Sequence, residues 1–237
     1  MVLAGGRSRR MGQNKALMHL GNDTIIAHVI RQMQAVTNNL LLITNTPDLY
    51  AHLGLPMHAD LVPNMGTLGG IYTGLTYAAS SAALCVGCDM PLLQPGLLSH
   101  LITILEEYDA VVPCVQAADR PRASQQKSPP TDEIRPPKSP QVSEDLGGRE
   151  TAELFPLRSA VPIFQTLSAV YSKRCLPVID QMLTEGELRV HALYERICAR
   201  IVEPEEWQSL DPQGLSFFNI NTPEDLEKAI VHLVVDS

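Results

Sequence analysis

No stretch of the sequence approaches about 18 consecutive apolar residues, so no segment has the composition of a membrane-spanning helix. The beginning lacks the apolar core of a secretory signal peptide. The five cysteines are an odd number and are scattered, mostly within apolar runs, a usage that does not suggest a disulfide framework. These absences favour a protein of the reducing cytoplasm. A chain of 237 residues with 45% hydrophobic content is long enough for one sizeable core.

Acidic residues are missing from the beginning of the chain, where none occurs before Asp23. The whole chain is acidic, with 26 Asp and Glu against 18 Lys and Arg and a formal net charge of -8. Its first 15 residues nevertheless hold three glycines and four cations, which are Arg7, Arg9, Arg10 and Lys15. An acidic chain with one local basic segment is suited to a small multiply charged anion. We therefore expect neither nucleic acid nor a membrane as a partner.

Strand-like and helix-like apolar runs alternate along the chain. The runs MVL, NLLLIT, AALCV and DAVVPCV are typical of buried strands, whereas TIIAHVIRQMQAV, LGGIYTGLTYAAS and PGLLSHLITILEEY are typical of helices. After residue 150 the pattern resumes with LSAVYSKRCLPVIDQML, a strand that runs into a helix. A last helix is predicted after Thr222, because Thr222 and Asp225 form a variant of the capping box around Pro223. The alternation predicts an α/β fold with a mostly parallel sheet and helices on both faces.

The alternation is interrupted at residues 117–150, which contain six of the 18 prolines and cannot form a core. We interpret this segment as a flexible proline-rich insertion; a functional loop over the active site is the alternative. The predicted organisation is one domain, with a first half at residues 1–116 and a second half at residues 151–237.

The opening segment has the order strand, Gly-rich turn and helical stretch, which points backbone N–H groups at an anion. Gly5 and Gly6 allow a close approach of the backbone, and the nearby cations can contact phosphate oxygens. Neither standard phosphate motif matches, because the lysine does not directly follow a glycine and no G-x-G-x-x-G occurs. A solvated basic segment beside a glycine turn is the alternative.

A second feature is Asp89, which follows the apolar run AALCVGC. Functional groups of open α/β sheets gather at the carboxyl ends of strands, and one carboxylate there can anchor Mg²⁺ together with waters and phosphate oxygens. Asp89 could instead cap the turn before Pro91.

Cys85 and Cys88 form a C-x-x-C, but a spacing of three residues on a strand sends the two thiols to opposite faces, which disfavours a redox or zinc site.

Polar residues also follow other predicted strands. Each alone is a common turn or cap residue, but together they suggest a polar rim. The candidates for this rim are Thr44, Asn45, Asp60, Asn219 and Asn221. The seven histidines have no ligand spacing, and no nucleophile elbow is present.

In their order and spacing, LAGGRSRRMGQNKAL, GTLGGI, GCDMP and FFNINTPEDL resemble the nucleotidyltransferases that complete the molybdenum cofactor, and among them the molybdenum cofactor guanylyltransferases. The resemblance spans most of residues 1–115 and returns at residues 166–234. It implies a Rossmann-like nucleotidyltransferase fold, with residues 1–116 as the nucleotide-binding half of the domain and residues 151–237 as the acceptor-side half. Within the family, Gly5-Gly6 and Asp89-Met90-Pro91 favour GTP over CTP.

The resemblance implies roles for individual residues. Leu3, Ala4 and Gly5 match the backbone around the base and phosphates, and Lys15 matches the phosphate contact. Further matches are Asn45 and Asp60 at nucleoside-binding positions, Asp89 as the Mg²⁺ ligand, and Arg10 with Lys15 and Asp89 as the catalytic set.

The implied reaction transfers GMP from GTP to molybdopterin, with release of pyrophosphate. It also implies cofactor-accepting molybdoenzymes or their chaperones as later partners. Three departures from the family are visible: the first strand is short, Thr67 replaces the proline of GPLGG, and the insertion at residues 117–150 has no counterpart. The alternatives are transfer from CTP, another phosphorylated acceptor, or a nucleotide-binding module without turnover.

Overall fold

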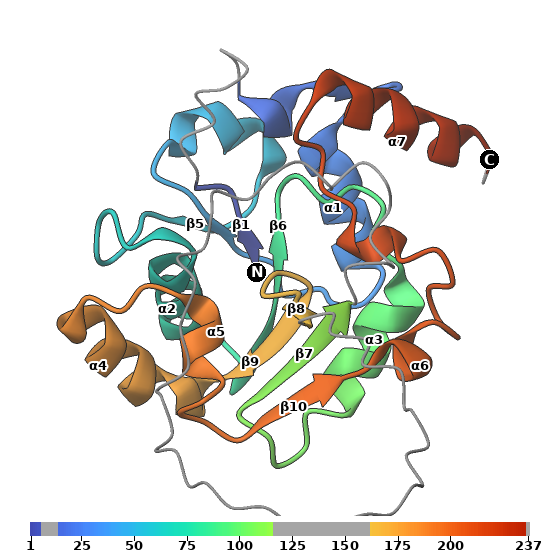
Figure 1. Ribbon diagram of the computed structural model, residues 1–237. Coiled ribbons are helices and arrows are strands. Elements are labelled where there is room, and N and C mark those ends of the chain that lie inside the picture. The colour runs from blue at the N-terminus through green and yellow to red at the C-terminus, as the bar shows by residue number, and fades with distance from the viewer. Residues whose placement is uncertain (6–13, 116–161, 236–237) are drawn as a thin grey trace, which may run out of the picture.

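The computed structural model describes residues 1–5, 14–115 and 162–235. The predicted insertion and Arg10 with its basic neighbours lie outside the described residues. The described chain folds around one eight-stranded sheet (Figure 1). In spatial order its strands are β10 (Ala199–Val202), β7 (Ala110–Val115), β9 (Ala169–Ser172), β6 (Ala82–Gly87), β1 (Val2–Leu3), β4 (Leu42–Ile43) and β5 (Met57–His58). The eighth, β8 (Ile163–Phe164), pairs with β7 off this path.

The sheet is mostly parallel, as the sequence predicted. Strand β1 pairs in parallel with β4 and β6, β4 pairs in parallel with β5, and β10 with β7. The exceptions are β9, which lies antiparallel between β6 and β7, and β8, which runs antiparallel to β7. A strand from the second half of the chain is therefore inserted between two strands of the first half.

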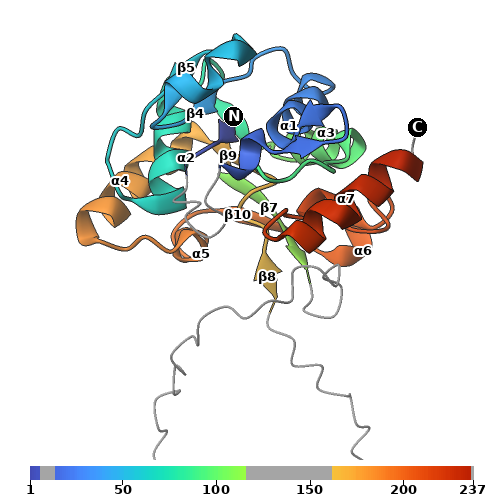
Figure 2. The ribbon, with the colours of Figure 1, turned by 90° about the horizontal axis from the view of Figure 1, so that it is seen from above.

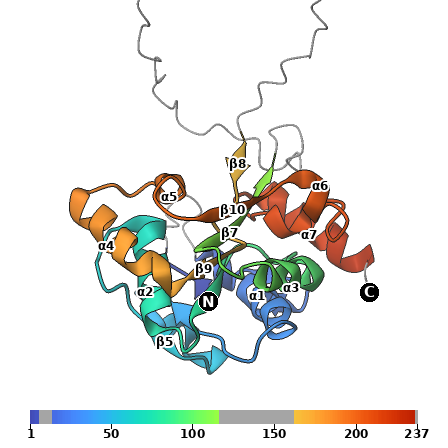
Figure 3. The ribbon, with the colours of Figure 1, turned by 90° about the horizontal axis from the view of Figure 1, so that it is seen from below.

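Helices cover both faces of the sheet (Figures 2 and 3). One face is covered by α2 (Gly66–Tyr77), α4 (Leu176–Glu185) and α5 (Val190–Leu193), and the other by α1 (Ile25–Gln34), α3 (Pro95–Thr103) and α6 (Pro204–Trp207). Successive strand residues alternate between the two cores: Val2 packs on the α1 side and Leu3 on the α2 side. The period of two along each strand is what lets one apolar run serve both layers.

The last helix, α7 (Pro223–Val235), begins with the predicted capping box. Asp225 Oδ2 accepts hydrogen bonds from the backbone N–H groups of Asn221 and Thr222 at 2.9 and 3.0 Å, and Thr222 Oγ1 accepts one from Asp225 N at 3.2 Å. The helix packs against a small hairpin of β2 (His19–Leu20) and β3 (Asp23–Thr24) through a third apolar cluster. This packing brings Asn221 close to the beginning of the chain.

Within the described ranges, no helix combines the length and the apolar composition needed to cross a membrane.

Candidate active site

The candidate site lies where β1, β4 and β6 end. Val2 is level with Leu42 and Val86, and Leu3 is level with Ile43 and Gly87. Because the three strands are parallel and in this register, the residues that follow them emerge side by side at one edge of the sheet.

A cleft of about 1120 Å³ opens at this edge. Its volume is slightly above that of ordinary ligand pockets, which enclose roughly 300–1,000 Å³. All the predicted site residues that the structure describes line it: Leu3, Ala4, Gly5, Lys15, Asn45, Asp60 and Asp89. The structure thus brings these residues together, and their individual roles remain predictions. Arg10 is outside the described residues.

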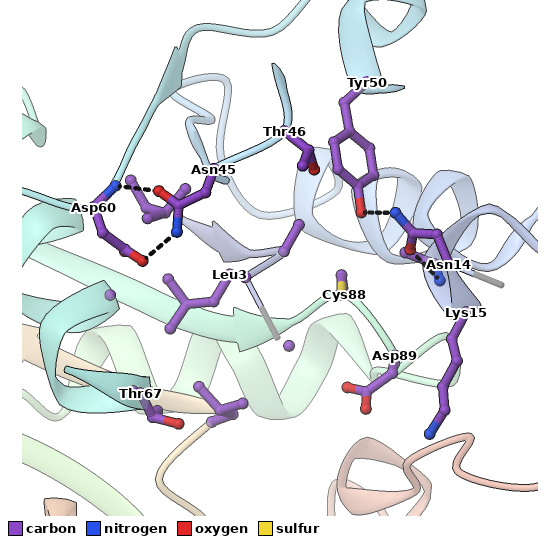
Figure 4. A pocket seen from close by; sticks show the side chains of 18 of the residues that line it. Leu3, Asn14, Lys15, Asn45, Thr46, Tyr50, Asp60, Thr67, Cys88 and Asp89 are labelled. Carbon is purple, nitrogen blue, oxygen red and sulfur yellow. Dashed lines mark hydrogen bonds between the residues drawn. The ribbon is translucent and has the colours of Figure 1, made fainter. Parts of the chain in front are cut away.

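Asn45 and Asp60 form a two-point pair on one side of the cleft (Figure 4). Asn45 Nδ2 donates to Asp60 Oδ2 at 2.7 Å, and Asp60 N donates to Asn45 Oδ1 at 3.0 Å. The pair joins the loops that follow β4 and β5. Gly5 faces it, since a Cβ at position 5 would lie 3.9 Å from Asp60 Oδ2. This side of the cleft offers polar atoms beside the apolar side chain of Leu3.

Lys15 lies on the opposite side (Figure 4). It is the first residue of a short 3₁₀ helix, η1 (Lys15–Leu17), whose N-cap is Asn14. Asn14 Oδ1 accepts from Ala16 N at 3.2 Å, and Asn14 Nδ2 donates to the Tyr50 hydroxyl oxygen at 2.8 Å. Lys15 Nζ donates to Asn221 Oδ1 at 3.3 Å. The turn that carries Lys15 is therefore fixed by residues of the first half of the chain, and its ammonium group contacts a residue of the second half.

Asp89 follows β6 and is half-buried on the same side as Lys15. Burial raises the pKa of its carboxyl group, while its backbone N–H and the Lys15 ammonium oppose that rise. The carboxylate folds back over Gly87, where a Cβ would lie 2.7 Å from Asp89 Oδ1. Glycine at position 87 is therefore needed for this side-chain position.

The two cysteines of the C-x-x-C pack on opposite sides of the sheet. Cys85 packs in the core on the α2 side and Cys88 against the core on the α1 side, as predicted from their spacing. Both thiols are free, and burial raises the pKa of each to about 12. Cys88 lines the cleft as a neutral side chain.

The other predicted rim residues differ in position. Thr44 is buried and its Oγ1 accepts from Thr46 N at 3.2 Å, so it stabilises the turn and does not face the cleft. Asn221 does not line the cleft, but its Oδ1 accepts the hydrogen bond from Lys15 Nζ. Asn219 Oδ1 is buried and has no hydrogen-bond partner among the described residues.

Sequence reasoning missed several residues that line the cleft. They are Asn14, Ala16, Ile43, Thr46, Leu49, Tyr50, Asn64, Gly66, Thr67, Gly70, Gly87, Cys88 and Leu167. Most belong to loops and to the 3₁₀ helix η2 (Pro47–Leu53), where apolar periodicity carries no signal. The quoted motifs were the available signal, because they contain Asn14, Ala16, Gly66, Thr67, Gly70, Gly87 and Cys88.

The donor set suits a magnesium ion bound mainly by its substrate. Among the described residues, no group of three or more His, Cys, Asp or Glu side chains is placed to hold a metal ion. Asp89 places one carboxylate, a hard oxygen donor, at the cleft. Mg²⁺ keeps waters and phosphate oxygens as its other ligands, so a single carboxylate fits this ion better than zinc.

The model of the MobA-like NTP transferase domain matches residues 1–201. The chain belongs to this family. A MobA-like NTP transferase is a nucleotidyltransferase, and the cleft at the carboxyl ends of β1, β4 and β6 is its candidate active site.

Relatives resemble the chain along nearly its whole length. A probable molybdenum cofactor guanylyltransferase of Pelotomaculum thermopropionicum is 31% identical over 98% of this chain and 91% of its own. A molybdenum cofactor guanylyltransferase of Desulfosudis oleivorans is 31% identical over 97% of this chain and 92% of its own.

Solved structures show the same fold. The molybdopterin-guanine dinucleotide biosynthesis protein A of Archaeoglobus fulgidus superimposes with a TM-score of 0.69 at 19% identity, over 99% of this chain and 97% of that one. The 2-C-methyl-D-erythritol 4-phosphate cytidylyltransferase of Thermus thermophilus superimposes with a TM-score of 0.61 at 18% identity, over 98% and 97%. The nucleotidyltransferase fold predicted from the sequence is confirmed.

The position of Asp89 can be tested at Gly87. In Gly87→Ala the new methyl group displaces the Asp89 carboxylate, and nucleotidyl transfer should fall by about tenfold or more, which corresponds to a loss of about 1.4 kcal/mol of transition-state stabilisation. Steady-state rates measure the effect. Gly96→Ala is the matched control, because its Cβ meets no atom within 4 Å. A Gly87→Ala enzyme with the wild-type rate would contradict the dependence on this carboxylate.

Proposed function

We propose that the protein transfers GMP from GTP to molybdopterin, forming the guanine dinucleotide cofactor and releasing pyrophosphate. The observation that carries the proposal is that seven residues predicted from the sequence line one cleft. The Asn45–Asp60 pair, which is suited to binding a nucleoside, lies at one side, and Lys15 and Asp89 lie at the other. The names of the 31% identical relatives support the choice of substrates.

The cleft suggests an orientation for the nucleotide. The nucleoside would lie against Leu3 and the Asn45–Asp60 pair, whose amide and carboxylate oxygens can accept hydrogen bonds from sugar hydroxyls or base amino groups. The triphosphate would extend across Gly5 toward Lys15. Backbone N–H groups donate hydrogen bonds to phosphate oxygens, and an ammonium group adds a charge-assisted one.

The chemistry requires positioning and charge neutralisation by the chain. A phosphate oxygen of molybdopterin attacks the α-phosphorus of GTP, a new P–O bond forms, and the bond to pyrophosphate breaks. The attacking phosphate is already anionic at neutral pH, because its second pKa lies near 6, so no general base is needed. Lys15, with Arg10 from the opening segment, would hold the two anions in line and stabilise the leaving charge.

Mg²⁺ is the metal that fits the site, with Asp89 as its protein ligand. When bound, it neutralises phosphate charge and stabilises the departing pyrophosphate. Asp89 must be ionised to hold it, and the nearby Lys15 ammonium favours the ionised carboxyl against the effect of burial.

The proposed setting is the reducing cytoplasm. All five cysteines are free, which is compatible with that setting. Cofactor-accepting enzymes or their chaperones would then receive the product.

The nucleotide assignment predicts that GTP is used in preference to CTP. Purified protein is incubated with Mg²⁺, molybdopterin and either nucleotide, and the dinucleotide product and pyrophosphate are measured. GTP should give the larger kcat/KM, since Gly5-Gly6 and Cys88-Asp89-Met90-Pro91 match the guanylyl pattern. Equal or faster transfer from CTP would contradict the assignment, and pyrophosphate release without molybdopterin would point to another reaction.

Substitutions at Lys15 and Asp89 should change GTP affinity and turnover differently. Lys15→Ala removes a fixed cation from the phosphates, so GTP binding and transfer should both weaken, by about 2 kcal/mol for a charge-assisted contact. Asp89→Asn removes the charge that anchors the metal, so turnover should fall more than GTP affinity. Binding by calorimetry and turnover across a Mg²⁺ titration separate the two. Wild-type turnover of Asp89→Asn at every Mg²⁺ concentration would make Asp89 a turn residue only.

A further inference from the structure

Tyr50 is a buried tyrosine whose hydroxyl group lies at the cleft. The residue is 1% exposed, lies in the core on the α1 side, and also lines the cleft. Burial raises the pKa of the phenol, so the hydroxyl group stays neutral at physiological pH. The mechanism proposed above gives this hydroxyl no role in contacting substrate. Its contact is Asn14, the residue that precedes Lys15.

Asn14 connects the tyrosine to the lysine by two hydrogen bonds. Its Nδ2 donates to the Tyr50 hydroxyl oxygen at 2.8 Å, which fixes the plane of the amide. Its Oδ1 accepts from Ala16 N at 3.2 Å, which caps the 3₁₀ turn that begins with Lys15. Figure 4 shows the tyrosine, the asparagine and the lysine in sequence along one side of the cleft.

The tyrosine is itself held on a well-defined segment. Helix η2, which carries it, begins directly after Thr46, and Leu49 N donates to Thr46 O at 3.2 Å. Asn45, at the start of the same segment, is paired with Asp60. The segment therefore spans the cleft from the polar pair to the lysine side. A buried, rigid side chain with one hydroxyl is suited to fixing a flexible neighbour.

We propose that Tyr50 is a positioning residue that acts through Asn14 to hold Lys15 in place for the phosphates. The tyrosine hydroxyl orients the Asn14 amide, the amide caps the turn, and the turn sets the direction from which the lysine side chain enters the cleft. Lysine has a long flexible stem, so fixing its backbone lowers the conformational entropy lost when its ammonium group binds phosphate. The inference rests on the proposed function only in that Lys15 contacts the nucleotide.

The test compares GTP affinity, measured by calorimetry with Mg²⁺ and no acceptor, in Tyr50→Phe and wild-type protein. Removing the hydroxyl should weaken GTP binding by roughly three- to tenfold, the range that one hydrogen bond supplies. Asn14→Ser should give a similar loss, because serine can still cap the turn but is too short to reach Tyr50. The double variant should bind GTP no more weakly than the single variant with the lower GTP affinity, because both substitutions break the same contact.

The decisive comparison is made in a Lys15→Ala background. There Tyr50→Phe should change GTP affinity by less than about twofold, because the residue through which it acts is gone. A merely structural tyrosine would weaken binding equally in both backgrounds, and that result overturns the proposal. Wild-type affinity in Tyr50→Phe overturns it too.

Two controls separate the effect of Tyr50 on Lys15 from a general effect of losing a tyrosine hydroxyl group and from misfolding. Tyr72→Phe removes a hydroxyl group that donates to Asp180 Oδ1 of α4 at 3.3 Å, and it should leave GTP affinity unchanged because Tyr72 does not line the cleft. If Tyr50→Phe does not fold, Asn14→Ser and its Lys15→Ala combination decide by the same criteria. Because GTP binding needs no acceptor, absence of transfer to molybdopterin in the wild type would contradict the proposed function and leave this comparison intact.

Discussion

The register of three parallel strands determines where the site forms. Leu3 of β1 is level with Ile43 of β4 and Gly87 of β6, and the backbone bonds Ala4 N to Ile43 O at 2.8 Å and Cys88 N to Leu3 O at 3.1 Å lock the three ends together. A shift of one residue in any strand would turn its side chains to the other face and carry its loop out of the cleft. The apolar residues that fill both cores are therefore also what aligns the polar residues of the site.

The second constraint is charge. The chain has a net charge of -8, so a multiply anionic ligand is repelled except where cations are concentrated and held. Lys15 is held from two directions: its turn is capped by Asn14, and its ammonium group contacts Asn221 at the start of α7. The Asp225 carboxylate fixes the backbone at Asn221. The site thus joins residues 206 positions apart, and the packing of α7 contributes to the position of the lysine.

Much of this arrangement could be predicted from the sequence, because it follows local rules. The alternation of strands and helices, the capping box at Thr222 and Asp225, and the opposite faces of Cys85 and Cys88 all depend on residues close in sequence. The direction of β9 could not be predicted, since a buried strand has the same composition in either direction.

The contacts of Tyr50 could not be predicted either. In the sequence, Tyr50 is one aromatic residue in a connection between two strands. Only the fold brings its hydroxyl group to Asn14. Pairs of this kind, like Asn45 with Asp60, depend on which loops become neighbours in space and leave no periodic signal in the chain.

The central claim is that a nucleoside triphosphate spans the cleft between the Asn45–Asp60 pair and Lys15 with Asp89. The most direct test is a crystal structure of the protein with Mg²⁺ and a GTP analogue whose α,β-bridging oxygen is replaced by methylene. The account predicts the nucleoside against Leu3 and the Asn45–Asp60 pair, the triphosphate across Gly5 beside Lys15, and the metal on Asp89. A triphosphate bound away from Lys15, or a metal held without Asp89, would contradict it.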